Sequence, residues 1–204
     1  MEKKILEKSA DLFLTYGFKS ITMDDIANSL GISKKTIYQY YDNKHKLVEA
    51  TTLHLFDQIS YGINHICEVH ENPIEEIYDI KNLVMVHLKG EKTSPQYQLQ
   101  KYYPKIYKTL KNKQFDLMQD CVVNNLKKGI ELGLYRKTID VNFIARLYFN
   151  NMICLKDYDI FPLELFSIND SMDHYLEYHI RGICTEKGLN VLTQVIAKEK
   201  TSHD

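Results

Sequence analysis

Residues 22–47 read TMDDIANSLGISKKTIYQYYDNKHKL, and this stretch decides the fold of the N-terminal part of the chain. Thr22 stands three residues before an aspartate, which is the spacing of a capping box at the start of a helix. A glycine ends that short helix, and Ser33 is placed to cap a second one. Two short helices separated by a glycine turn predict a helix-turn-helix motif over 24–30 and 34–40.

Apolar residues recur at three- and four-residue steps on both sides of this motif, and that period is typical of amphipathic helices. One such stripe runs from Glu2 to Tyr16, and a longer one runs from Lys44 to about His70. Apolar and polar residues alternate nowhere for long, so the sequence predicts an all-α fold. The further helices that we expect cover residues 73–88, 104–130 and 141–156 and the segment from about 171 to 196.

The charges of the 204 residues nearly cancel, because 26 lysines and arginines oppose 27 aspartates and glutamates. A polyanion such as DNA would therefore have to meet a local basic patch rather than a basic surface all round. Residues 33–47 contain such a patch, in which four lysines oppose only Asp42 and give a formal charge of +3.

Several classes of protein are disfavoured by the sequence. The four cysteines form no Cys-x-x-Cys pair and are too sparse for a disulfide framework, so we expect reduced thiols that behave as small apolar side chains. The N-terminus is charged and amphipathic, and no stretch of about 18 apolar residues occurs, so a soluble, cytoplasmic protein is expected. Catalytic, nucleotide-binding and metal-binding motifs are missing, which predicts no enzymatic activity, no cofactor and no metal site.

The run over 22–47, preceded by Ala10 and Gly17, strongly resembles the N-terminal signature of the tetracycline-repressor (TetR) family of bacterial transcription regulators. The resemblance covers about the first quarter of the chain, and the remainder is similar only in architecture. It implies a three-helix DNA-binding domain over 1–47. The long helix would join this domain to a helical effector-binding and dimerisation domain over 48–204.

The second helix of the motif would enter the major groove, where side chains near its N-terminus contact bases and phosphates. Ile37 and Tyr41 lie four residues apart on its core face, which leaves its lysines and other tyrosines for DNA. The resemblance implies phosphate contacts for Thr22 and Lys44, and groove contacts for residues of the second helix. The alternative is that these lysines form a solvated surface and that the tyrosines belong to the core. The predicted DNA-binding residues are Thr22, Ser33, Lys34, Lys35, Thr36, Tyr38, Tyr40 and Lys44.

The C-terminal part is rich in aromatic residues, which suit either a cavity for a small, largely apolar effector or an ordinary core. Two apolar helices near the C-terminus are also suited to pair with their symmetry mates as a four-helix bundle. The candidate effector-binding residues are Tyr103, Tyr107, Met118, Cys121, Tyr148 and Met152. The candidate dimerisation residues are Tyr148, Met152, Tyr175, His179 and Ile183.

Together these features predict a sequence-specific DNA-binding transcriptional regulator. We expect a ligand-responsive repressor that binds a palindromic operator as a homodimer, with the long helix coupling effector to DNA. An activator would have the same sequence features. The alternative from another class is a helical protein that binds DNA constitutively, organises the chromosome or recruits partners, and has no small-molecule effector.

Overall fold

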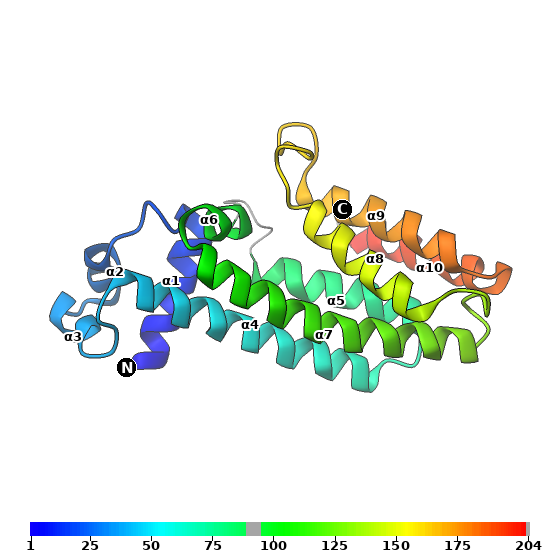
Figure 1. The fold of residues 1–204 in the computed structure, drawn as a ribbon, viewed down its shortest axis with the longest axis horizontal. Coiled ribbons are helices and arrows are strands. Elements are labelled where there is room, and N and C mark those ends of the chain that lie inside the picture. Colours follow the sequence, from blue (N-terminus) through cyan, green and yellow to red (C-terminus); the bar gives the residue numbers. More distant parts are fainter. Residues whose placement is uncertain (89–94, 203–204) are drawn as a thin grey trace. The chain divides into compact units, whose positions relative to one another are not determined.

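The computed structural model describes residues 1–88 and 95–202, and the regular elements of this part are α-helices (Figure 1). Its one isolated β-bridge joins Tyr135 to Cys184 in antiparallel orientation. None of the described helices combines the length and apolar character needed to cross a membrane. The helices are α1 (Glu2–Tyr16), α2 (Met23–Leu30), α3 (Lys34–Tyr38), α4 (Lys44–Val69), α5 (Pro73–His87), α6 (Pro95–Tyr102), α7 (Pro104–Glu131), α8 (Val141–Cys154), α9 (Ile168–Ile183) and α10 (Glu186–Ser202).

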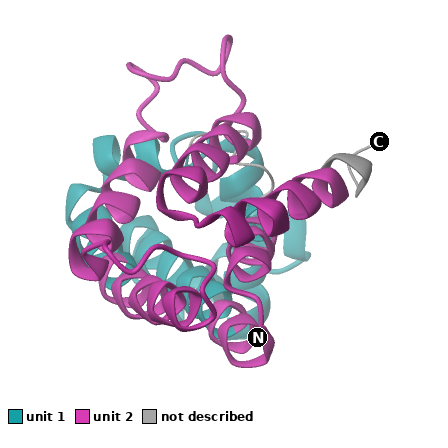
Figure 2. Cartoon of the chain, turned by 90° about the vertical axis from the view of Figure 1, so that its right-hand side faces the viewer, with its two compact units in different colours: residues 1–61, 85–114 teal, residues 62–84, 115–204 magenta. Residues whose placement is uncertain are grey.

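The chain divides into two compact units, coloured separately in Figure 2. Unit 1 contains Met1–Tyr61 and Met85–Gln114, and unit 2 contains Gly62–Val84 and Phe115–Asp204. Three helices, α4, α5 and α7, therefore contribute residues to both units.

The core of unit 1 is built by the first three helices and the start of α4. Ile5 of α1, Ile26 of α2 and Ile37 of α3 are completely removed from solvent. Burying three such side chains stabilises the unit by several kcal/mol, at about 1.5–3 kcal/mol for each. The small Ala27 is also buried in this core. Residues of α6 and α7 complete the same cluster, namely Leu99, Ile106 and Leu110.

The core of unit 2 joins residues from α5 and α7 to α10. Tyr135, Leu176 and Leu192 are completely buried in it. A Cβ atom at Gly129 would overlap the ring of Tyr135, so the glycine makes room for this aromatic side chain. A Cβ atom at Gly188 would overlap the backbone carbonyl of Leu134. Because glycine has no Cβ atom, the start of α10 can lie against the segment that follows α7.

The all-α fold predicted from the sequence is confirmed, and so are the expected N-caps at Thr22 and Ser33. Two expectations were incomplete. The helix expected from about residue 171 begins at Ile168, because the Ser167 hydroxyl accepts a hydrogen bond from a backbone amide of its first turn. The short helix α6 was not predicted at all.

Candidate nucleic-acid interface

The first helix of the helix-turn-helix motif is fixed by its two ends. At the N-terminus, the Thr22 amide donates to Oδ2 of Asp25 over 2.8 Å, and the Asp25 amide donates back to Oγ1 of Thr22 over 3.2 Å. These bonds to Thr22 lower the pKa of Asp25, so its carboxylate remains charged at the positive end of the helix dipole. At the C-terminus, Gly31 has φ 65° and ψ 31°, a left-handed conformation that glycine adopts without strain. The turn that follows is therefore set by local chemistry.

The second helix, α3, presents a polar face. The Ser33 hydroxyl caps it by accepting a hydrogen bond from the Thr36 amide over 3.1 Å. Ile37 is its buried residue, whereas Lys34, Lys35 and Tyr38 are exposed. A helix that buries only one residue and exposes long donors is suited to the major groove.

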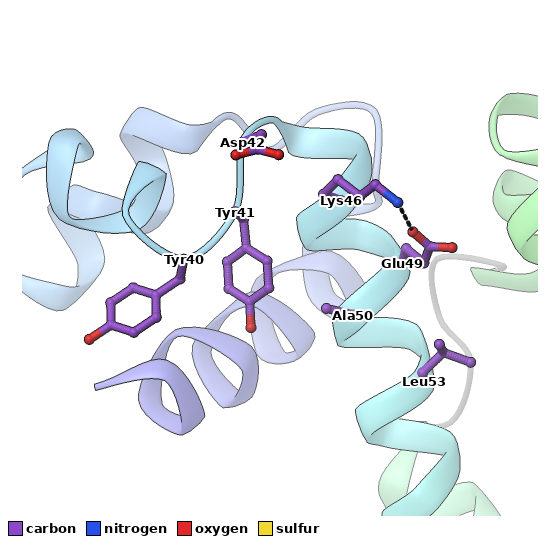
Figure 3. A pocket seen from close by; sticks show the side chains of 7 residues that line it. All are labelled: Tyr40, Tyr41, Asp42, Lys46, Glu49, Ala50 and Leu53. Carbon is purple, nitrogen blue, oxygen red and sulfur yellow. Dashed lines mark hydrogen bonds and ion pairs between the residues drawn. The ribbon is translucent and has the colours of Figure 1, made fainter.

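Two adjacent tyrosines after α3 have different environments (Figure 3). Tyr41 is buried, and its hydroxyl donates to Oε1 of Glu2 over 3.3 Å. Burial raises the pKa of Tyr41 to about 12. Tyr40 keeps 43% of its surface exposed, as does Tyr38. The prediction that Tyr41 belongs to the core is confirmed, and Tyr38 and Tyr40 remain accessible.

Tyr40 and Tyr41 also line a hollow of about 350 Å³ beside the start of α4. Lys46 and Glu49 form an ion pair on one of its walls, with 2.9 Å between Nζ and Oε2. The lining residues are Tyr40, Tyr41, Asp42, Lys46, Glu49, Ala50 and Leu53.

The lysines of the basic patch are held in different ways. Nζ of Lys34 lies 2.7 Å from Oδ2 of Asp24, in an ion pair that raises the pKa of the lysine. Nζ of Lys44 donates to the carbonyl of Lys19 over 3.3 Å, and partial burial lowers its pKa despite the attraction of Asp25. Lys35 is exposed, and within the described ranges no acceptor is bonded to its amine. Exposed ion pairs contribute little stability, so a phosphate can replace Asp24 at small cost.

The eight predicted DNA-binding residues are all exposed or partly exposed. The ion pair between Lys34 and Asp24 connects the N-termini of α2 and α3, and the negative charge of Asp25 acts on Lys44 at the start of α4. Sequence reasoning did not select Lys19, whose side chain is exposed and whose carbonyl holds Lys44. It lies just outside the motif, and only the fold brings it beside α4.

The six candidate effector-binding residues belong to different parts of the structure. Tyr103 and Tyr107 pack against the core of unit 1. Met118, Tyr148 and Met152 pack in or against the core of unit 2. The sixth, Cys121, lies beside the thiol of another cysteine in unit 2. The six residues are therefore divided between the two units.

The five candidate dimerisation residues lie together, but largely inside the protomer. The ring centroids of Tyr148 and His179 are 5.2 Å apart, and those of Tyr175 and His179 are 5.5 Å apart. Tyr148, His179 and Ile183 are buried in the core of unit 2, and Met152 packs against it. The same two helices expose other apolar side chains that sequence reasoning did not select, namely Phe143, Leu147 and Tyr178.

The N-terminal part of the chain is similar to bacterial transcription regulators. The family model of bacterial regulatory proteins, tetR family, matches residues 5–51. Over 50 residues the chain is 50% identical to the uncharacterized HTH-type transcriptional regulator YvaF of Bacillus subtilis, which covers 24% of this chain and 26% of that protein. Over 72 residues it is 31% identical to the biofilm operon icaADBC HTH-type negative transcriptional regulator IcaR of Staphylococcus epidermidis, covering 35% and 37%. The chain thus matches about a quarter to a third of the length of these curated relatives.

The whole fold is similar to solved structures of regulators. SmeT, the repressor of the Stenotrophomonas maltophilia multidrug efflux pump SmeDEF, superimposes with a TM-score of 0.65 at 15% identity, covering 91% of each chain. A complex of SmeT with triclosan gives a TM-score of 0.64 at 13% identity, covering 91% of this chain and 92% of that one. At these identities the similarity establishes the fold.

Proposed function

We propose, from the membership of residues 5–51 in the tetR family of bacterial regulatory proteins, that this protein is a sequence-specific DNA-binding transcriptional regulator. The observation that carries the proposal is the exposed face of α3. Its one buried residue, Ile37, anchors the helix, and Lys34, Lys35 and Tyr38 project outward. A regulator acts where the chromosome is, so we place the protein in the cytoplasm of a bacterium.

Two kinds of DNA contact follow from this arrangement. Lys35 and Tyr38 lie on the exposed face of α3 and would contact base edges in the major groove. Thr22 and Lys44 lie at the starts of α2 and α4 and would hold phosphates on either side of the groove. Lys34 would exchange the carboxylate of Asp24 for a phosphate.

One such module buries too little surface for tight specific binding, so we propose a homodimer. Its two copies of α3 would read half-sites of a palindrome about one helical turn apart, roughly 34–36 Å. The exposed side chains of α8 and α9 support an interface at these helices, because Phe143 and Tyr178 leave 63% and 78% of their surfaces in water. Burying apolar side chains of this size contributes about 1.5–3 kcal/mol each.

We also propose that the protein is a repressor whose affinity for its operator falls when a small, largely apolar effector binds. The names of IcaR, a negative regulator, and of SmeT, a repressor, support the direction of control. The complex of SmeT with triclosan supports an apolar ligand for this fold. Met118, Tyr148 and Met152 are the effector-binding candidates that share one core, and unit 2 is therefore our choice for the site.

The test is a selection of bound fragments from a bacterial genomic DNA library with the purified protein at physiological salt. We expect enrichment of a palindrome by the unchanged protein, loss of that enrichment in Tyr38→Ala, and its retention in the control Tyr61→Ala. Tyr61 is an exposed tyrosine on α4, outside the motif. Weak binding without enrichment, equal in all three proteins, would contradict the proposal and favour constitutive, architectural DNA binding.

A further inference from the structure

Two cysteines that are 54 residues apart in the sequence meet in unit 2. Sγ of Cys67 on α4 lies 2.7 Å from Sγ of Cys121 on α7. A disulfide bond has a length of about 2.05 Å, so the sulfur atoms need to approach by only about 0.7 Å to form one. Both residues are partly exposed. No short cysteine spacing in the sequence indicates this pair.

The surroundings of the pair make its two thiols unequal. A hydrogen bond from Cys121 lowers the pKa of Cys67, and the charge of Lys128 acts in the same direction, whereas burial and Glu76 oppose the shift. The bond to Cys67 and burial raise the pKa of Cys121. Cys67 is therefore the thiol of the pair that loses its proton more readily, and Cys121 is the one that keeps it. Since a thiolate is the nucleophilic form of cysteine, Cys67 is the one that reacts first with an electrophile.

We propose that Cys67 and Cys121 are a redox modification site, at which a hydroperoxide converts the two thiols into a reversible disulfide. The Cys67 thiolate attacks the peroxide oxygen, breaks the O–O bond and becomes a sulfenic acid, while the other oxygen leaves as hydroxide and takes up a proton. The Cys121 sulfur then attacks the Cys67 sulfur, loses its proton and expels hydroxide, which leaves as water. Two thiols and one hydrogen peroxide thus give one disulfide and two waters.

A metal site is the competing use of the same atoms. Glu76 is buried, and one of its carboxylate oxygens lies within 4.8 Å of both sulfur atoms. Two thiolates on one zinc ion, at Zn–S distances of about 2.3 Å and tetrahedral angles, are about 3.8 Å apart. The pair would have to open by about 1 Å to hold zinc. The Asn125 amide already donates to Oε1 of Glu76 over 2.8 Å, so the carboxylate also has a partner within the protein.

The other two cysteines provide internal controls. Cys184 is buried, and burial raises its pKa to about 11, so it is a poor nucleophile. Cys154 is partly exposed near the end of α8. Neither has another cysteine sulfur within hydrogen-bond distance among the residues that the structure describes. Only the Cys67–Cys121 pair is expected to form a bond within one chain.

The experiment is to treat the reduced full chain with hydrogen peroxide, remove the peroxide and count free thiols after denaturation. We expect two of the four thiols to disappear, peptide mapping to find Cys67 joined to Cys121, and dithiothreitol to restore both. The oxidised chain should also have a higher Tm, because the bond closes a long loop and restricts the unfolded chain. Disulfide formation at this pair needs no DNA, so the result is independent of operator binding.

Matched variants give the assay its specificity. Cys67→Ser and Cys121→Ser should each abolish the intramolecular disulfide, whereas Cys154→Ser should form it as the unchanged protein does. Persistence of four thiols under peroxide would overturn the proposal, and so would a crosslink found only between chains. Stoichiometric binding of Zn²⁺ that needs Cys67, Glu76 and Cys121, with no disulfide formed by the metal-free chain, would assign the cluster to metal instead.

Discussion

Lys81 is a charged residue whose side chain is only 1% exposed, so its amine depends on the groups around it. Its Nζ lies 2.7 Å from Oδ1 of Asp173 and 3.4 Å from Oε2 of Glu199. The amide of Asn82 donates to the same glutamate over 3.0 Å. The lysine of α5 thereby links α9 and α10 in unit 2. Removing one partner of such a buried group leaves the remaining charges without compensation.

We therefore expect Lys81→Met to lower the free energy of unfolding by about 3 kcal/mol, the low end for a buried pair because the carboxylates are partly exposed. The matched control is Lys198→Met, which removes an exposed lysine 3.2 Å from Glu75 and should cost less than about 1 kcal/mol. Urea denaturation of both variants measures the difference. Equal losses in the two variants would show that burial does not govern the Lys81 network.

His179 gives the stability of the protein a dependence on pH. Burial lowers its pKa to about 4, whereas an unfolded histidine titrates near 6.5. Between these values the unfolded chain binds a proton that the folded chain does not, so stability falls as the pH is lowered through this window. The free energy of unfolding is expected to fall by about 3 kcal/mol because of this histidine. The loss is complete below pH 4 and absent above about pH 7.

The measurement is the free energy of unfolding of the unchanged protein and of His179→Gln at several pH values between 4 and 7. Other groups also contribute to the pH dependence, including Glu76, whose pKa burial raises. Their effects are common to both proteins, so the difference between the two curves isolates the histidine. We expect a flatter curve for His179→Gln, and parallel curves would refute the assignment.

Sequence reasoning succeeded for residues whose roles depend on near neighbours. Thr22 and Ser33 could be identified as caps, and Tyr41 as a core residue, because the partners or the helical period lie within a few positions. It did not find the contact between Cys67 and Cys121, which depends on the packing of α4 against α7.

The helix-turn-helix motif depends on how α2 begins. The Thr22 hydroxyl accepts the hydrogen bond of the Asp25 amide, and α2 has only eight residues to share the cost of an uncapped end. Most helices were predictable because their apolar stripes are long. α6 was missed because its eight residues include three glutamines and show no clear stripe, although Leu99 is buried in the core of unit 1.

Thr22→Ala should therefore lower the free energy of unfolding by about 1 kcal/mol, whereas Thr22→Asn should keep most of it because asparagine also caps helices well. Thermal and urea denaturation of the two variants check this. The pair also separates the two roles of the residue, since a phosphate contact by the hydroxyl predicts weaker DNA binding in both variants. Equal stability of Thr22→Ala and the unchanged protein would mean that the cap does not support α2.

The arrangement of the whole chain was the least predictable level. Residues 95–110 contribute Leu99, Ile106 and Leu110 to the core of unit 1. No local sequence pattern indicates that this segment packs against helices near the N-terminus. The candidate dimerisation residues show the same problem, because a helical stripe of apolar residues predicts burial without saying which surface covers it. Tyr148 and Ile183 are covered by the chain's own core.

The proposed dimer gives a prediction for α8. Phe143→Glu places a charge on an exposed apolar side chain and should convert the dimer to a monomer, because burying an unpaired carboxylate in an interface is costly. Light scattering at micromolar concentration measures the mass. Val86→Glu changes an apolar residue on α5 that is even more exposed than Phe143, and it should leave the dimer intact. A monomer for the unchanged protein, or a dimer for Phe143→Glu, would remove α8 from the interface.

The central claim is that α3 reads DNA sequence while the starts of α2 and α4 hold phosphates. The direct measurement is the Kd for a selected genomic fragment and for a scrambled fragment, over a series of salt concentrations. We predict that the unchanged protein prefers the selected fragment by about 10³-fold or more. Tyr38→Ala should lose most of this ratio. Lys44→Ala should bind both fragments more weakly by the same factor, and the salt slope of its affinity should be smaller by about one. Equal affinity of the unchanged protein for the two fragments would contradict the account.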